Sequence, residues 1–225
     1  MPFGITDLDA RLGGGLRAGA LHEATALAAT LADDAATTLF LAGIAAREAF
    51  GRGQPVLWVT CRTDLYAPGL AQAGLLASDV IYAEAREDAQ LLAVMEDAVR
   101  DGTPAAVIGE ISRLPMIAAR RLQLVAADAD IPVLLLRRSR ARQPDPYAEP
   151  SAAWTRWRIG VAPSARLAVA GVGRARWQVE LVRQRGGEPF SLIVEGCDET
   201  GRLTVPAALG HREAEAVGAV RTAAA

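Results

Sequence analysis

The 225-residue sequence predicts an α/β fold, in which a mostly parallel sheet is flanked by helices and extended by C-terminal antiparallel strands. Apolar runs of strand length alternate along the chain with segments of helical periodicity. The runs before Arg138 are continuously apolar, which is typical of parallel strands covered on both faces. Later runs alternate polar and apolar residues, which is typical of antiparallel strands. With 51% apolar residues, the chain can bury one substantial core.

The first part of the chain predicts a parallel core over residues 3–138. A short apolar strand ending at His22 and Glu23 follows a glycine-rich turn. Continuous apolar runs predict further strands at residues 55–61, 79–85, 104–111 and 131–138. Apolar residues at helical spacing predict helices at residues 33–50, 87–100 and 114–129. Helices of this length between strands predict right-handed crossovers.

The second part predicts an antiparallel extension over residues 153–205. A polar, basic and proline-rich stretch at 137–153 predicts a loop. Alternating runs predict strands at residues 154–162, 176–184 and 190–196, and "RGGEP" between the last two predicts a hairpin turn. We therefore expect a single domain over residues 1–205. The alanine-rich tail 206–225 is expected to be flexible or loosely helical.

Bulk properties argue against several classes of protein. The net charge of −2 does not indicate a nucleic-acid or membrane binder. The apolar runs are shorter than the roughly 18 residues that span a bilayer, and the acidic start does not resemble a signal peptide, so we expect a cytoplasmic protein. Cys61 and Cys197 are predicted to be buried thiols, and the two histidines to form neither a zinc site nor a catalytic dyad.

The segment after the first strand has the place of a phosphate loop but lacks its chemistry. A Walker A loop, G-x-x-x-x-G-K-[ST], needs glycines to wrap phosphate, a lysine to neutralise it and a hydroxyl to hold magnesium. Between His22 and Thr37 there is no glycine, and all 24 lysine-plus-arginine residues of the chain are arginine. Thr37 and Thr38 could supply the hydroxyl. The sequence therefore predicts no nucleotide cofactor and no catalytic residue.

Asp33 and Asp34 place carboxylates where phosphate would lie. At about 4 Å and an effective dielectric constant near 20, each such pair of like charges costs on the order of 4 kcal/mol. Carboxylates at a helix N-terminus also cap free N–H groups, which is the structural interpretation of both residues. Glu110, near the end of its predicted strand, is expected to be a buried or paired acid and not a metal ligand.

The segment "FGITDLDARLGGGLRAGALHEA" resembles the entry to the RecA-like ATPase core, and the following segments keep RecA order up to about residue 138. Within that group, the chain is similar to the ImuA family, SOS mutagenesis accessory proteins with a degenerate Walker A loop. The resemblance lies in "LGGGLRAGALHE", the degraded loop, "ISRLPMIAARRLQLVAADADIPVLLLRR" and the C-terminal "TRWRIGVAPS" and "RARWQVELVRQRGGEPFSLIVEG". It covers most of the chain to about residue 205.

The resemblance implies a RecA-like sheet and a non-catalytic scaffold in damage-induced translesion synthesis. The implied partners are the Y-family-like protein ImuB and an error-prone C-family DNA polymerase, with RecA as a further partner and only weak or indirect contact with DNA. The implied location is the cytoplasm, with nucleoid association during the damage response.

Arginines and tryptophans gather in the second part of the chain as candidate partner or DNA contacts. They are Arg137, Arg138, Arg140, Arg142, Trp154, Arg156, Trp157 and Arg158. Arginine interleaved with aromatic residues suits protein hot spots and single-stranded DNA. A solvated loop beside tryptophans that fill a core is the third interpretation, and the sequence leaves all three open.

Two rival functions also remain open. A SulA-like inhibitor of the tubulin-like cell-division protein would share the fold and the lost loop, although the C-terminal Trp-Arg region argues against it. A functional ATPase or recombinase would have to bind ATP despite the missing residues. Because the fold signal begins near Phe3, we also expect no RecA-type filament.

Overall fold

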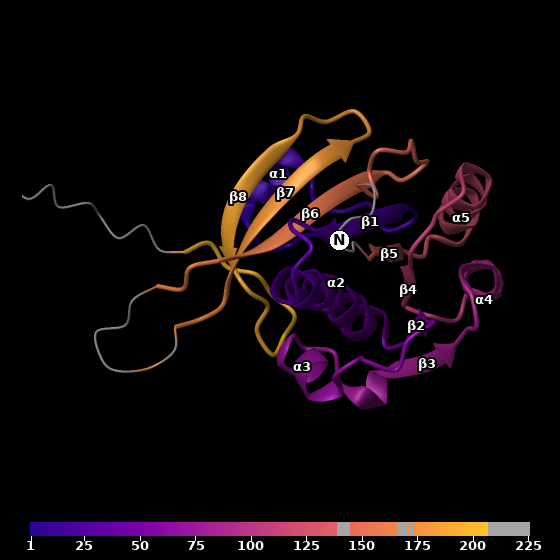
Figure 1. Ribbon diagram of the computed structural model, residues 1–225, viewed down its shortest axis with the longest axis horizontal. Coiled ribbons are helices and arrows are strands. Elements are labelled where there is room, and N and C mark those ends of the chain that lie inside the picture. Colours follow the sequence, from indigo (N-terminus) through magenta and orange to yellow (C-terminus); the bar gives the residue numbers. More distant parts are fainter. Residues whose placement is uncertain (139–144, 166–170, 172, 207–225) are drawn as a thin grey trace, which may run out of the picture.

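The computed structural model describes residues 1–138, 145–165, 171 and 173–206. Within these residues an eight-stranded sheet forms the centre of the molecule (Figure 1). Its strands, in spatial order, are β3 (Val80–Glu84), β2 (Val56–Thr60), β4 (Ala106–Ile111), β5 (Val133–Arg137), β1 (Leu21–Ala26), β6 (Thr155–Ala162), β7 (Arg176–Gln184) and β8 (Phe190–Glu195). The first six run parallel, and the pairs β6–β7 and β7–β8 are antiparallel, which confirms the predicted fold class.

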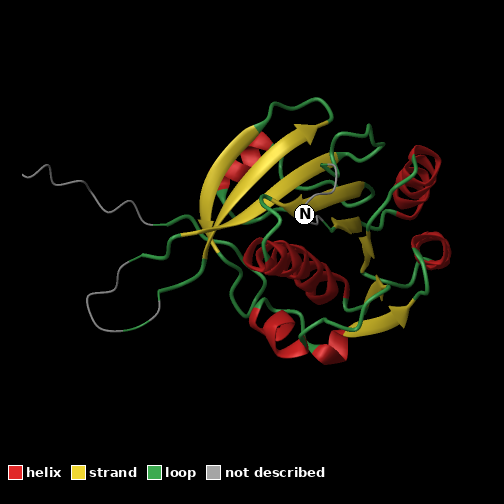
Figure 2. Cartoon of the chain, viewed as in Figure 1, coloured by secondary structure: helices red, strands yellow, loops and turns green. Residues whose placement is uncertain are grey.

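Helices cover both faces of the sheet (Figures 1 and 2). They are α1 (Thr6–Arg11), α2 (Leu31–Arg52), α3 (Ala67–Gln72), α4 (Asp88–Asp101) and α5 (Met116–Ala129), with a 3-10 turn at Ala77–Asp79. One hydrophobic core lies on the α2 side and contains Phe40, Trp58 and Trp157. The other lies beneath α4 and α5 and contains Leu91 and Met95. The strands at the centre are buried on both faces, which explains their continuous apolar sequence.

Two boundaries differ from the sequence prediction. Strand β1 begins just before His22 and Glu23 and continues to Ala26, so these residues lie near its start. Strand β6 was assigned to the antiparallel extension, but it pairs in parallel with β1 and only its other edge is antiparallel. The parallel sheet is therefore one strand wider than predicted. The cause is that β6 is buried on both faces like a central strand, despite its polar residues.

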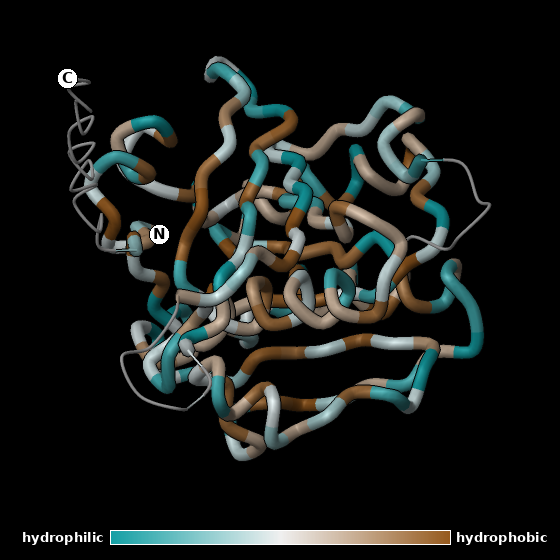
Figure 3. The backbone as a smooth tube through the Cα atoms, turned by 60° about the vertical axis from the view of Figure 1, so that its left-hand side comes forward, coloured by the Kyte–Doolittle hydropathy of each residue, from teal (hydrophilic) through white to brown (hydrophobic). Residues whose placement is uncertain are grey.

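The predicted α4, α5 and β7–β8 hairpin are confirmed within one or two residues at most ends. Helix α1 was not predicted, and α3 was expected only from the resemblance to RecA order, because six residues are too few to show a period. Figure 3 shows hydrophobic residues along many inner stretches of the chain and hydrophilic residues at many outer turns. The predicted tail falls outside the described residues except for Pro206.

Both cysteines are free thiols, but one differs from its prediction. Cys61 is exposed, because β2 ends at Thr60 and the chain has already left the sheet. Cys197 is partly buried, and burial raises the pKa of its thiol to about 12. Among the described residues, no helix has both the length and the apolar character needed to cross a membrane.

Candidate functional site

The loop between β1 and α2 is closed by a carboxylate of the chain itself. Helix α2 begins at Leu31, with Thr30 as its N-cap: the Thr30 hydroxyl accepts the Asp33 N–H at 3.1 Å. The buried Asp33 carboxylate then accepts the N–H of Ala28 in the loop and the N–H of Val161 in β6, each at 2.9 Å. Asp33 thus places a carboxylate on one amide of the loop and on one amide of the neighbouring strand, and backbone amides of such a loop are the groups that would bind an anionic ligand.

The remaining amides of the loop are also largely occupied. The N–H of Leu27 donates to the Ile159 carbonyl at 2.8 Å, and the N–H of Thr30 donates to the Ala28 carbonyl at 2.8 Å. A phosphate entering this loop would have to displace Asp33 from its hydrogen bonds or lie against its negative charge. Both carry a cost in free energy.

The two threonines that could have held magnesium lie elsewhere. Thr37 and Thr38 lie six and seven residues beyond the start of α2, inside the helix. Their hydroxyls donate to the carbonyls of Asp33 and Asp34, at 2.7 and 2.8 Å. The sequence placed both threonines in this helix, as the structure does, but it expected the helix to begin at Asp33, two residues later than Leu31. Their hydroxyl protons are used within the helix.

Both carboxylate oxygens of Glu110, in β4, accept hydrogen bonds from other side chains. Glu110 is 4% exposed; its Oε1 accepts the indole N–H of Trp58 at 2.9 Å, and its Oε2 accepts Nε and Nη2 of Arg138 at 3.1 and 2.7 Å. Arg138 also lies 3.7 Å from the Asp34 carboxylate. Burial raises the pKa of Asp34, with Arg138 acting in the opposite direction. Glu110 is a buried, paired acid, as predicted.

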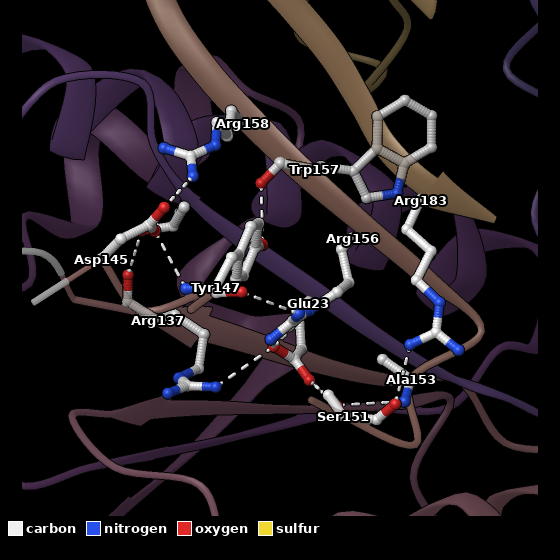
Figure 4. A network of polar contacts seen from close by, with 11 residues as sticks. Glu23, Arg137, Asp145, Tyr147, Ser151, Ala153, Arg156, Trp157, Arg158 and Arg183 are labelled. Atoms are coloured by element: carbon white, nitrogen blue, oxygen red, sulfur yellow. Dashed lines mark hydrogen bonds and ion pairs between the residues drawn. The ribbon is translucent and has the colours of Figure 1, made fainter. Parts of the chain in front are cut away.

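A second charge cluster surrounds Glu23 of β1 (Figure 4). The Glu23 carboxylate is fully buried between the guanidinium groups of Arg137 at 3.2 Å and Arg156 at 3.3 Å, and it accepts the Ser151 hydroxyl. Arg156 stacks over the ring of Tyr147 at 4.2 Å. The Tyr147 hydroxyl donates to the Trp157 carbonyl, and burial raises the pKa of that hydroxyl well above 10. The cluster fastens the segment before β6 onto the sheet.

His22 has a structural role in the same strand. Its Nε2 lies 2.8 Å from the Arg17 carbonyl, so this nitrogen donates, and Nδ1 accepts from the Thr155 hydroxyl at 2.7 Å. Burial lowers the pKa of the ring to about 4. Among the described residues, no three or more of the His, Cys, Asp and Glu side chains are grouped to hold a metal ion.

Comparison with known proteins decides the family. No protein-family model matches the chain. Protein ImuA from two strains of Caulobacter vibrioides is 36% identical to it over 201 residues, which cover 87% of this chain and 82% of the relative. The chain belongs to the ImuA family. Membership confirms the resemblance in the sequence motifs and associates the chain with SOS mutagenesis.

In this member of the ImuA family, the six candidate contact residues that the structure describes do not form one surface. Arg137, Arg156 and Trp157 are at most 5% exposed, and the two arginines hold Glu23. Arg138 is largely buried against Glu110. Arg158 is partly exposed and pairs with Asp145, and Trp154 is partly exposed. Arg140 and Arg142 lie outside the described residues. The contact hypothesis is therefore carried chiefly by Trp154 and Arg158.

The structure also brings together residues of the ImuA-family chain that the sequence kept apart. Arg17, from the turn before β1, lies over the Trp154 ring, and Arg185 from the hairpin lies near the same ring. No local sequence pattern indicates this group, because Trp154 lies 137 residues after Arg17 and 31 residues before Arg185 in the sequence. Only the pairing of β6 with both β1 and β7 places them side by side.

Proposed function

We propose that this protein is a non-catalytic accessory protein of damage-induced translesion synthesis, acting through contacts with other proteins. Family membership supports the pathway. The observation that carries the non-catalytic role is the Asp33 carboxylate, which accepts the N–H of Ala28 in the β1–α2 loop and the N–H of Val161 in β6 and so places a negative charge where a nucleotide phosphate would bind. The absence of lysine from the sequence and the engagement of Glu110 with Trp58 and Arg138 support the same conclusion.

The proposed partners are ImuB and the error-prone C-family polymerase, with RecA as a further candidate, and any contact with DNA is weak or indirect. The buried carboxylates of Glu23 and Glu110 are paired with arginines of the same chain. We therefore expect the protein to act through its surface contacts and not through a reaction centre. The SulA-like alternative gains no support from the structure, and membership of the ImuA family favours the first function.

Nucleotide binding is tested by titrating Mg-ATP into the purified chain in a calorimeter, with Mg-ATP into buffer as the blank. We expect no saturable heat at ATP concentrations of about 1 mM, where even a dissociation constant of 1 mM, or about −4 kcal/mol, would register. Saturable binding with one site per chain would overturn the non-catalytic proposal.

Partner binding is tested with the tagged chain immobilised on beads and presented with purified ImuB encoded in the same genome. An unrelated tagged protein on the same beads is the control. We expect ImuB to be retained at protein concentrations of about 1 µM, a typical range for specific assemblies. Failure to retain ImuB there, with both proteins shown to be folded by circular dichroism, would contradict the proposed function.

A further inference from the structure

Two arginines lie against the ring of a tryptophan just before β6, and a third is bound to the backbone of the segment that precedes it. We call Arg17, Trp154, Arg183 and Arg185 the Trp154 patch. The guanidinium carbon of Arg17 lies 4.5 Å from the centre of the Trp154 ring, and that of Arg185 lies 5.5 Å from it. Such cation–π contacts contribute about 0.5–1 kcal/mol each at exposed sites. The patch therefore joins an aromatic surface to fixed positive charge.

Backbone contacts hold the patch in place. The Trp154 N–H donates to the Leu21 carbonyl at 2.7 Å, and the Arg185 N–H donates to the Trp154 carbonyl at 3.0 Å. The side chain of Arg183 donates to the Ser151 carbonyl at 2.9 Å, and that of Arg185 to the Ala152 carbonyl at 2.8 Å. Each bond uses only part of a guanidinium, which carries five N–H groups. The remaining N–H groups are pre-positioned for an acceptor from outside, which lowers the entropy cost of binding.

The charge of the patch is not neutralised within the described residues. Arg17, Arg183 and Arg185 are exposed, and none has a described carboxylate within ion-pair distance, in contrast to Arg137, Arg138, Arg156 and Arg158. Trp154 is partly exposed, whereas the other tryptophans, Trp58, Trp157 and Trp177, are at most 3% exposed. A partner that brings carboxylates would supply what the patch lacks.

We propose that the Trp154 patch binds an acidic segment of a protein partner, with carboxylates on the arginines and an apolar side chain against Trp154. Arginine pairs with carboxylate in a two-bond geometry, and tryptophan and arginine are enriched in interface hot spots. A nucleic acid fits less well, because the chain's net charge of −2 disfavours a polyanion. The proposal rests on the proposed function, which it deepens by naming a surface.

The binding test uses a fluorescein-labelled peptide of about 12 residues that alternates glutamate or aspartate with leucine. Its neutral counterpart carries glutamine in place of each acid. We expect fluorescence anisotropy to report binding of the acidic peptide with a dissociation constant below about 1 mM. The double variant Arg17→Glu/Arg185→Glu should bind at least about 30-fold more weakly, because two attractive charges become repulsive.

The matched control is the double variant Arg86→Glu/Arg120→Glu, which makes the same change in charge at exposed arginines on other elements. It should bind the peptide within about threefold of wild type if the contact is local, since distant exposed charges are screened at physiological salt. Equal weakening by both double variants, or no binding by wild type, would overturn the proposal. So would stronger binding of oligo(dT) that depends on Arg17 and Arg185, because the patch would then be a nucleic-acid site.

Tryptophan emission gives an independent readout of where the peptide binds. Acrylamide should quench Trp154 far more than the three buried tryptophans, and the acidic peptide should protect it. Trp154→Phe should remove the quenchable emission while leaving the fold, measured by circular dichroism, unchanged. Peptide binding without protection of Trp154 would place the segment elsewhere and contradict the proposal.

Retention of ImuB on beads separates this inference from the proposed function. If wild type retains ImuB and the Arg17→Glu/Arg185→Glu variant retains it equally, the patch is not its docking surface, and the proposed function stands. If wild type retains no ImuB, the proposed function fails, whereas the peptide titration still decides whether the patch binds acidic segments.

Discussion

At the scale of single residues, several arginines of this protein pair with buried carboxylates of the same chain. Arg137 and Arg156 enclose Glu23, and Arg138 holds Glu110, all with little exposure to solvent. Burying an ion costs several kcal/mol, which is recovered only when further hydrogen bonds satisfy both partners. Ser151 supplies one for Glu23, and Trp58 supplies one for Glu110. A planar fork of donors makes arginine suited to such sites.

Asp33→Ala tests the carboxylate in the β1–α2 loop. The substitution leaves the N–H groups of Ala28 and Val161 without their acceptor, and we expect a loss of about 2–4 kcal/mol in the free energy of unfolding. Asp128→Ala, at an exposed position of α5, should change it by less than about 0.5 kcal/mol. Urea unfolding followed by circular dichroism measures both.

The same variant tests whether Asp33 occupies an anion site. Sulfate should raise the melting temperature of Asp33→Ala more than that of wild type, because the freed N–H groups of Ala28 and Val161 can donate to an anion. An equal rise in both proteins would show only the general stabilising effect of sulfate.

His22 predicts a pH dependence of stability. Its folded pKa of about 4 lies below the unfolded value of 6.5, so the unfolded chain binds a proton first as the pH falls. The contribution is fully present above about pH 6.5 and is lost toward pH 4, with a limit on the order of 3 kcal/mol. Asp34, whose pKa is raised, acts in the opposite direction. Urea unfolding near pH 7.5 and pH 5 should show a steeper loss for wild type than for His22→Gln; parallel losses would contradict this assignment.

At the scale of elements, the segment after β8 returns to close the α2 side of the fold. Cys197 contacts α2 at Gly43, and the backbone at Thr200 and Gly201 runs directly against Gly74, after α3. A Cβ added at Gly74 would lie 2.5 Å from the Gly201 nitrogen, and its φ of +88° is one that other residues rarely adopt. Glycine is required there by both backbone conformation and space.

Gly74→Ala tests this close approach against a matched control. Gly53, at the end of α2, also has a positive φ of +63° but no atom within 4 Å of an added Cβ. Gly53→Ala should cost about 1–2 kcal/mol of unfolding free energy from backbone strain alone. Gly74→Ala should cost about 1–3 kcal/mol more, because the returning segment must move. Equal losses in thermal or urea unfolding would mean that the segment does not pack tightly on Gly74.

At the scale of the whole molecule, one continuous sheet joins the parallel and antiparallel parts. Strand β6 shares an edge with β1 and another with β7, and Trp157 of β6 packs with Phe3, Phe40 and Phe190 from both ends of the chain. We therefore propose that residues 1–205 form a single domain.

A single domain predicts one cooperative unfolding transition. Far-UV circular dichroism, which reports the whole sheet, and tryptophan fluorescence should give coincident urea curves, and the calorimetric and van't Hoff enthalpies should agree. A second transition, seen by one probe only, would show that the β7–β8 hairpin unfolds on its own.

Much of this architecture could be predicted from local sequence. The runs at 55–61, 104–111 and 131–138 gave β2, β4 and β5, because strands buried on both faces are continuously apolar. The helix start at Leu31 was missed, because the Thr30 cap precedes a stretch without a clear period. Contact with a partner was one of three interpretations left open for the Arg-Trp region; Arg137 is buried at the end of β5, and Arg156 and Trp157 are buried in β6, which for Trp157 agrees with the interpretation that tryptophans fill a core.

The sequence by itself determined the α/β class, the family and the loss of phosphate-loop chemistry, because periodicity, motifs and the absence of lysine are properties of the chain alone. Only the tertiary structure decided which charges meet. In the sequence, Glu23 is 114 residues from Arg137 and 133 residues from Arg156, the two arginines that pair with it. Asp33 is 128 residues from Val161, whose N–H donates to its carboxylate. Strand order sets these partners, and the same order brings no carboxylate of the described residues within ion-pair distance of the arginines at Trp154.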